Sequence, residues 1–272
     1  MKKVIFSLVV FSLVGLSSAQ AYDIDGSLAD WGVNIYDAAG ADEIHYLDNN
    51  LPSGGWGIDV TTDDNADKDS YYDYVGPGLT DYGNHYDAEA MYFDNDDKYA
   101  YFAIVTGLSP KEPDLGYPAG DIFLSVGSDP FTTLDYAFAI DVFSKKLYEV
   151  GEGGMEDISN YDDYPSFRVS TPWRLTRDSE GKVDTEVNEF VENSNILLAY
   201  TTTPLNDHYV IEGRISLEAI GAVDNVWLHW TMRCGNDYLN LQGTVSTPEP
   251  ATVLLLGGGL FGLAGFRRRR KI

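Results

Sequence analysis

The sequence predicts an all-β protein whose body is an antiparallel β-sandwich. Apolar and polar residues alternate over short stretches, turn-forming residues separate these stretches, and long helical periodicity is nearly absent. The clearest alternation runs from Leu134 to Val142, and a period of two is typical of a half-buried strand. The predicted strands are Glu89–Phe93, Tyr99–Thr106, Asp121–Val126, Leu134–Val142, Lys146–Val150, Ser166–Ser170, Glu186–Val191, Ile196–Tyr200, His208–Ile215 and Val226–Met232.

Turn chemistry fixes some of the connections between these strands. Asn95-Asp96-Asp97 lies between two aromatic stretches and predicts a hairpin. Only Leu217–Ile220 has the pattern of a helical turn. Two long stretches, Asn49–Tyr86 and Gly151–Glu180, are predicted as loops.

The first 21 residues have the parts of a secretory signal peptide. Lys2 and Lys3 form a positive n-region, Val4–Leu16 is an apolar h-region, and Ala19-Gln20-Ala21 fits the small-x-small rule for cleavage. We therefore expect export through the Sec machinery and a mature chain that starts at Tyr22. The alternative is an uncleaved membrane anchor, for which the h-region is short.

Residues 248–272 form a tripartite tail. Pro248-Glu249-Pro250 precedes an apolar run, Ala251–Phe266, and the chain then ends in a basic cluster. As a transmembrane helix the apolar run would span about 24 Å, which is short against a bilayer core of about 30 Å, although snorkelling arginines can bridge the difference. The basic stop, which holds the C-terminus in the cytoplasm, consists of Arg267, Arg268, Arg269, Arg270 and Lys271.

This tail resembles the PEP-CTERM signal of Gram-negative bacteria, which is read by membrane transpeptidases called exosortases. The resemblance implies cleavage near Pro248-Glu249-Pro250, a transient stay of residues 251–266 in the inner membrane, and delivery of the body to the cell surface or extracellular matrix. The two prolines disfavour helix locally and leave an extended, accessible segment. An ordinary C-terminal anchor that needs no enzyme is the alternative.

The body between the two signals, residues 22–247, is strongly acidic. Of the 18 Lys and Arg residues, two lie in the signal peptide and five in the tail, which leaves 11 in the body. Of the 43 Asp and Glu residues, only Glu249 lies outside the body, which leaves 42. The body therefore has a formal charge of −31. This charge excludes nucleic acid as a partner and is compatible with either solubility or binding of divalent cations. Because Cys234 is the only cysteine, no internal disulfide forms, and stability must come from the core.

Three pieces of the body resemble family 9 carbohydrate-binding modules and DOMON-like domains. Asp23–Trp31 contains Ile-Asp-Gly followed by Trp, Asp87–Ile104 contains two aromatic strands around a turn, and Tyr209–Ile215 is similar to their late strand before a short helix. The resemblance implies a jelly-roll or DOMON-like sandwich. It also implies, more loosely, an association with exopolysaccharide or another glycan.

Acidic loop residues offer one candidate metal site. Oxygen ligands at alternate positions can wrap one cation, and this alternation is found in Asp63, Asn65, Asp67 and Asp69. The EF-hand pattern is incomplete, because Lys68 replaces the turn glycine and Tyr74 stands at the last ligand position. Ca²⁺ is therefore the one candidate cofactor, and a solvated acidic loop is the alternative.

Aromatic residues in polar loops offer flat surfaces for sugar rings, and the candidates are Trp31, Trp56 and Trp173. Trp227 and Trp230 lie on one predicted strand with opposite facing, so at least one of them belongs to the core. The four histidines are scattered, and no nucleophile elbow, zinc-protease helix or phosphate loop is present.

These patterns predict an exported, non-catalytic protein of the cell surface or matrix that an exosortase sorts and that associates with exopolysaccharide. Two alternatives stay open. A glycan-cleaving enzyme needs only a pair of carboxylates, which so acidic a chain always supplies. A calcium-dependent structural adhesin would use the acidic loops.

Overall fold

A computed structural model describes residues 21–33, 57–62, 88–108, 119–131, 135–157, 173–202, 209–222, 224–232 and 238–246. The chain divides into two compact units, and the unit Gln20–Thr247 contains all of these residues. The other unit, Met1–Ala19 with Pro248–Ile272, lies outside the described residues. No helix among the described residues is long and apolar enough to cross a membrane.

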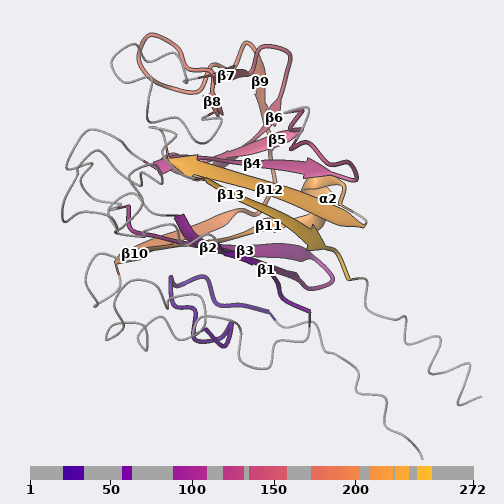
Figure 1. Ribbon diagram of the computed structural model, residues 1–272. Coiled ribbons are helices and arrows are strands. Elements are labelled where there is room, and N and C mark those ends of the chain that lie inside the picture. The colour runs from indigo at the N-terminus through magenta and orange to yellow at the C-terminus, as the bar shows by residue number, and fades with distance from the viewer. Residues whose placement is uncertain are drawn as a thin grey trace, which may run out of the picture. The chain divides into compact units, whose positions relative to one another are not determined.

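The described part of the chain consists mainly of two antiparallel sheets (Figure 1). The five-stranded sheet has the order β1 (Asp59–Thr62), β2 (Ala88–Asn95), β3 (Tyr99–Thr106), β11 (Tyr209–Ser216) and β10 (Leu197–Thr202). The six-stranded sheet has the order β13 (Tyr238–Thr244), β12 (Asn225–Met232), β4 (Ala119–Val126), β5 (Phe138–Asp141), β6 (Lys146–Val150) and β9 (Asn188–Phe190). A small third sheet pairs β7 (Met155–Asp157) with β8 (Trp173–Leu175).

The largest apolar cluster takes side chains from both large sheets. Phe93, Phe102 and Ile211 come from the five-stranded sheet, and Ile122, Leu228 and Trp230 from the six-stranded sheet. All six are nearly inaccessible to solvent. Burial of this shared face supplies the main driving force for folding, since the chain has no disulfide.

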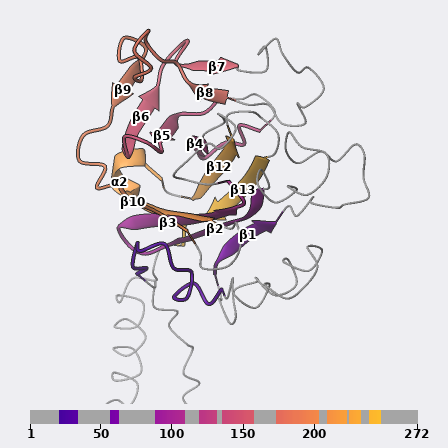
Figure 2. The same cartoon turned by 90° about the vertical axis from the view of Figure 1, so that its left-hand side faces the viewer.

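Each large sheet also buries part of its outer face. Residues of the N-terminal segment 22–33 cover the five-stranded sheet, next to β2 and β3 (Figure 2). The small sheet covers part of the six-stranded sheet, where Leu175 packs with Phe123 and Tyr148. Strands buried on both faces lose the polar alternation of a half-exposed strand, and β3 accordingly has seven buried residues in succession.

The hairpin between β2 and β3 and the short helix α2 (Leu217–Ile220) both form where the turn residues predicted them. The carboxylate of Asp96 accepts from the backbone N–H groups of Lys98 and Tyr99, both at 2.7 Å, and closes the hairpin. Ser216 caps the start of α2, and Gly221 ends it with a φ of 63°, a left-handed conformation that favours glycine.

Most predicted strands are confirmed, with bounds shifted by a few residues. The prediction for Leu134–Val142 is partly wrong, because β5 begins only at Phe138. Tyr136 precedes the strand and packs under the small sheet instead of joining Ile140 in the main cluster. The loop predictions are partly wrong, because β1 lies within Asn49–Tyr86 and β7 and β8 lie within Gly151–Glu180. The longer strand β13 was not predicted. Ser166–Ser170 lies outside the described residues.

Candidate functional site

The N-terminal segment is fastened to the five-stranded sheet by one buried carboxylate. Oε1 of Glu212 accepts a hydrogen bond from the indole Nε1 of Trp31 at 2.9 Å. Its Oε2 accepts from the backbone N–H groups of Gly26 at 2.7 Å and Asp25 at 3.0 Å. Glu212 lies on β11 and is fully buried. The contact therefore joins Asp25-Gly26 and Trp31, two parts of one sequence motif, to a strand far along the chain.

Gly26 is required at this junction by its conformation and by the space around it. Its φ of 81° is disfavoured for residues with a side chain. A Cβ atom would lie 2.2 Å from Oγ1 of Thr201, which donates to the carbonyl oxygen of Gly26 at 2.9 Å. The glycine thus lets the segment approach β10 and β11 closely.

The Glu212 contact makes stability depend on pH. Burial raises the pKa of Glu212 to about 7, although the hydrogen bonds from Trp31 and Gly26 act in the opposite direction. In the unfolded chain a glutamate titrates near 4.3. The unfolded state therefore loses its proton first as pH rises, and the free energy of unfolding is expected to fall by about 3 kcal/mol between pH 4.5 and 7.5.

Urea unfolding of the wild-type body and of Glu212→Gln at several pH values measures this effect. The variant has no proton to lose at this position, so its dependence on pH is expected to be flatter. Glu218→Gln, at an exposed position on α2, is the control and should keep the wild-type slope. If the free energy of unfolding changed equally with pH in all three proteins, Glu212 would not be the source of the pH dependence.

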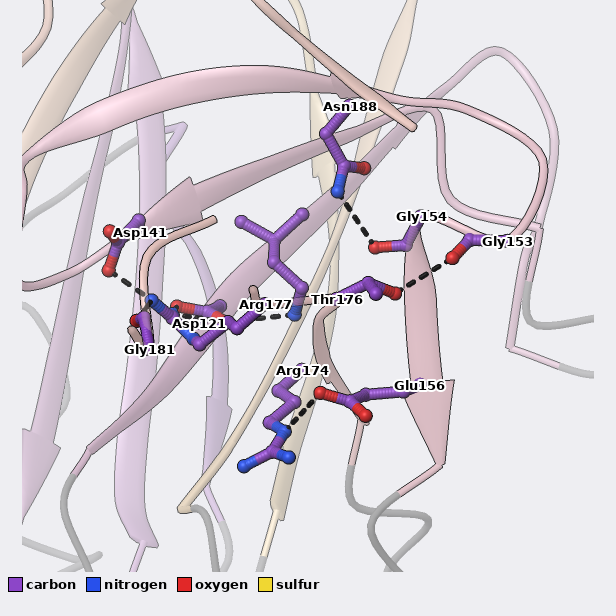
Figure 3. A network of polar contacts seen from close by, with 11 residues as sticks. Asp121, Asp141, Gly153, Gly154, Glu156, Arg174, Thr176, Arg177, Gly181 and Asn188 are labelled. Carbon is purple, nitrogen blue, oxygen red and sulfur yellow. Dashed lines mark hydrogen bonds and ion pairs between the residues drawn. The ribbon is translucent and has the colours of Figure 1, made fainter. Parts of the chain in front are cut away.

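On the six-stranded sheet, a buried ion network fastens the small sheet in place. Nη2 of Arg177 lies 2.9 Å from Oδ1 of Asp121 on β4 and 3.4 Å from Oδ1 of Asp141 on β5. Oδ2 of Asp121 also accepts from the backbone N–H of Leu175 at 2.9 Å. Figure 3 shows the guanidinium between the two carboxylates. Burial alone lowers the pKa of Arg177, but the two carboxylates outweigh it and the net direction is upward. Every member of the network is thus engaged in holding two layers together.

The other half of this outer face, on β12 and β13, carries aromatic and amide side chains. Trp227 is half-buried, and its ring meets Phe131 edge-to-face with a centroid distance of 5.3 Å. Among the described residues no acceptor lies within reach of the buried indole Nε1 of Trp227. Gln242 is opposite Trp227 on β13 and is exposed.

A histidine and an asparagine occupy the next row of this face. Nδ1 of His229 lies 2.7 Å from Oδ1 of Asn240, its cross-strand partner. Because a carboxamide oxygen only accepts, Nδ1 carries the proton in this pair. The imidazole lies between the rings of Tyr136 and Tyr238, at centroid distances of 5.7 and 6.2 Å. We call this region the aromatic-amide face; its accessible residues are Phe131, Trp227, Tyr238, Asn240 and Gln242, whereas Tyr136 and His229 are buried.

The tryptophans predicted as loop aromatics have different environments. Trp31 is only 1% exposed, its ring is stacked on Tyr22 at 4.0 Å, and its N–H is bound by Glu212. It therefore presents no free face to a sugar, contrary to the expectation, because the N-terminal segment is part of the packed fold. Trp173 is half-buried against the cluster under the small sheet. Trp56 lies outside the described residues.

Other predicted sites also fall outside the residues that the structure describes. These are the calcium candidates Asp63, Asn65, Asp67 and Asp69, the sorting motif Pro248-Glu249-Pro250, the basic stop Arg267–Lys271, and Ala19 of the signal cleavage site. Ala21 is exposed, and the next residue, Tyr22, is buried. Within the described ranges no group of three or more His, Cys, Asp or Glu side chains is arranged to hold a metal ion.

Comparison with known protein families identifies a sorting motif at the C-terminus. Residues 246–270 match the family model of the PEP-CTERM protein-sorting motif. No curated protein and no solved structure matches the chain significantly. The motif implies export, membrane-associated sorting to the cell surface, and an exosortase as the processing partner.

Proposed function

We propose that this chain is a non-catalytic surface or extracellular-matrix protein whose body binds polysaccharide, such as the exopolysaccharide of the producing cell. The sorting motif supports the destination, and the aromatic-amide face supports the binding. Sugar rings present C–H faces that pack on aromatic rings, and their hydroxyls pair with amide and imidazole groups.

The aromatic-amide face has both kinds of group in adjacent rows. Trp227 and Phe131 offer half-buried ring surface next to the exposed amide of Gln242. Asn240 and Tyr238 are half-buried on the neighbouring strand. The half-buried rings of Trp227 and Phe131 beside the exposed amide of Gln242 are the observation that carries the proposal.

We further propose that the two large sheets form a β-sandwich of the DOMON-like type. The shared apolar cluster favours this arrangement. The three sequence pieces that resemble these domains also meet, because Trp31 is hydrogen-bonded to Glu212 on β11 and β11 pairs with β3.

Affinity electrophoresis of the exported body in gels containing different polysaccharides tests binding. Trp227→Ala is expected to weaken retardation roughly ten-fold in apparent affinity, since aromatic anchors dominate such contacts. Phe190→Ala is the matched control, because Phe190 is an exposed aromatic on β9, away from β12 and β13. Equal retardation of both variants, or none on any polysaccharide, would count against the proposal.

Analysis of the polysaccharide after electrophoresis separates binding from cleavage. A binding protein leaves the chain length unchanged, whereas the formation of shorter chains would indicate a glycan-cleaving enzyme. Repeating the gels with a chelator tests whether Ca²⁺ contributes, and unchanged retardation is expected if the cation is not needed.

A further inference from the structure

The last described residues of the body are held from both sides of β13. On one side, the backbone N–H of Val245 donates to the carbonyl oxygen of Asp224 at 2.7 Å. On the other side, the N–H groups of Thr244 and Ser246 donate to side chains of the five-stranded sheet, Asp59 at 2.5 Å and Asn95 at 2.8 Å. Val245 also packs into the main apolar cluster. The strand edge is therefore secured up to Ser246.

Asn95 binds Ser246 through both ends of its carboxamide. Its Oδ1 accepts from the N–H of Ser246, and its Nδ2 donates to the carbonyl oxygen of Ser246 at 2.9 Å. Nδ2 also donates to the carbonyl oxygen of Asp96 at 2.7 Å in the hairpin turn. Asn95 is only 3% exposed. Water therefore does not compete strongly for these bonds, and their loss would leave buried groups unpaired.

The residue next to Asn95 holds the opposite end of the body. Oδ2 of Asp94 accepts a hydrogen bond from the phenol of Tyr22 at 2.5 Å. Tyr22 is buried and stacked on Trp31. Burial and the hydrogen bond to Asp94 raise the pKa of Tyr22, so the phenol remains a donor. Two consecutive residues at the end of β2 thus bind the residue that follows Ala21 and the residue two before Pro248.

We propose that Asp94 and Asn95 form a two-ended clamp that closes the fold at Tyr22 and Ser246, so that the exosortase acts on a body that is already folded. Asp94 and Asn95 are consecutive residues of one strand, so they bind Tyr22 and Ser246 on opposite faces of the sheet at the same end of β2. The body can then fold while the C-terminal tail is still held in the membrane. This inference uses the sorting motif and is independent of glycan binding.

The clamp also limits which peptide bonds the exosortase can cleave. The enzyme's nucleophile adds to the carbonyl carbon of a peptide bond, the C–N bond breaks, and the tail leaves as an amine that takes the nucleophile's proton. An acceptor amine or water then adds to the acyl carbon, the bond to the nucleophile breaks, and the nucleophile recovers a proton from the acceptor. Because the clamp secures the backbone through Ser246, the bond that is broken lies beyond Ser246, and Asn95 acts as a positioning residue for this step.

The intact mass of the exported body, isolated from cells that produce the full chain together with an exosortase, tests the clamp. The wild-type body is expected to have a single C-terminus beyond Ser246. In Asn95→Ala, local opening of the end of β13 is expected to increase roughly ten-fold or more, giving ragged C-termini. Asn95→Asp places a buried carboxylate oxygen against the carbonyl oxygens of Ser246 and Asp96, so its C-termini are expected to be at least as ragged as those of Asn95→Ala. A wild-type body that ends before Ser246, or unchanged ends in Asn95→Ala, would overturn the proposal.

Asn188→Ala is the matched control. Asn188 is equally buried. Its Nδ2 donates to the carbonyl oxygens of Gly154 and Asp184, both at 3.2 Å, and neither partner belongs to β13. This variant is expected to lose stability but keep a single C-terminus. Ragged ends in Asn188→Ala as well would show that general destabilisation is the cause and would overturn the assignment to Asn95.

A second measurement remains informative if a variant does not fold or if the tail is not processed. The wild-type chain is produced without an exosortase, and the membrane fraction is digested with a protease of broad specificity. The expected product is a protected fragment that extends through Ser246 while the chain is still tethered. Digestion of the tethered body into small fragments would refute folding before release.

Discussion

Replacing Arg177 with methionine is expected to lower the free energy of unfolding by about 3–5 kcal/mol. The side chain of Asp121 is inaccessible to solvent and that of Asp141 is 5% exposed. Methionine has a similar length but no charge, so the variant leaves two buried carboxylates next to each other without a cation. Urea unfolding of the exported body at neutral pH measures the loss.

Arg174→Met provides the control within the same layer of the structure. Arg174 forms an ion pair with Glu156 at 2.5 Å, but the two side chains are 29% and 37% exposed. An exposed pair contributes less than about 1 kcal/mol, so this variant should unfold almost like the wild type. Similar losses for Arg177→Met and Arg174→Met would contradict the role of burial.

A triple replacement separates the energy of the ion pairs from the cost of leaving charges unpaired. Asp121→Asn and Asp141→Asn combined with Arg177→Met remove all three charges together. We expect this variant to be more stable than Arg177→Met alone, because no uncompensated charge remains. A loss larger than that of the single variant would mean that the ion pairs themselves contribute most of the stability.

Turn formation explains part of the acidity of the body. In the described residues, several aspartates accept the backbone N–H of the residue two positions later, which is the geometry of an Asx turn. The pairs are Asp25 with Ser27, Asp96 with Lys98, Asp129 with Phe131, Asp141 with Phe143, Asp178 with Glu180 and Asp184 with Glu186. A chain of many short strands needs many such turns, so a high aspartate content there does not require a metal.

Local sequence signals were sufficient for most of the strands. The predicted bounds Tyr99–Thr106 and Lys146–Val150 are those of β3 and β6. β13 was missed although its pattern alternates, with Leu239 and Leu241 in the core and Asn240 and Gln242 on the other face. The strands β7 and β8 have three residues each, too few to show any period.

The contacts that organise the candidate sites could not be predicted from local patterns. Trp31 and Glu212 are 181 positions apart, and Asp121 and Arg177 are 56 apart. Which carboxylate of so acidic a chain becomes buried depends on strand order and register. Only the resemblance of Asp23–Trp31 and Tyr209–Ile215 to pieces of one domain type indicated that these segments belong together.

The aromatic-amide face was missed for a related reason. Trp227 and Trp230 were correctly predicted to face opposite sides, and Trp230 is the buried one. Trp227 is a candidate for sugar binding because of its neighbours. Strand pairing places Gln242 opposite it, and a loop brings Phe131 against its ring. The loop position of Trp31, by contrast, wrongly favoured an exposed ring.

Trp31→Ala is expected to lower the free energy of unfolding by about 3–5 kcal/mol, the usual range for a large aromatic removed from a core. Trp31 is among the largest fully buried side chains, and its loss removes the stacking partner of Tyr22 and one donor to Glu212. Trp31→Phe keeps most of the packing but lacks the N–H, so it should lose about 1–3 kcal/mol through the unpaired carboxylate oxygen. Thermal unfolding and proteolysis of residues 22–33 measure both effects. If Trp31→Ala were no less stable than Trp227→Ala, the N-terminal segment would be an attachment to the fold and not a part of its core.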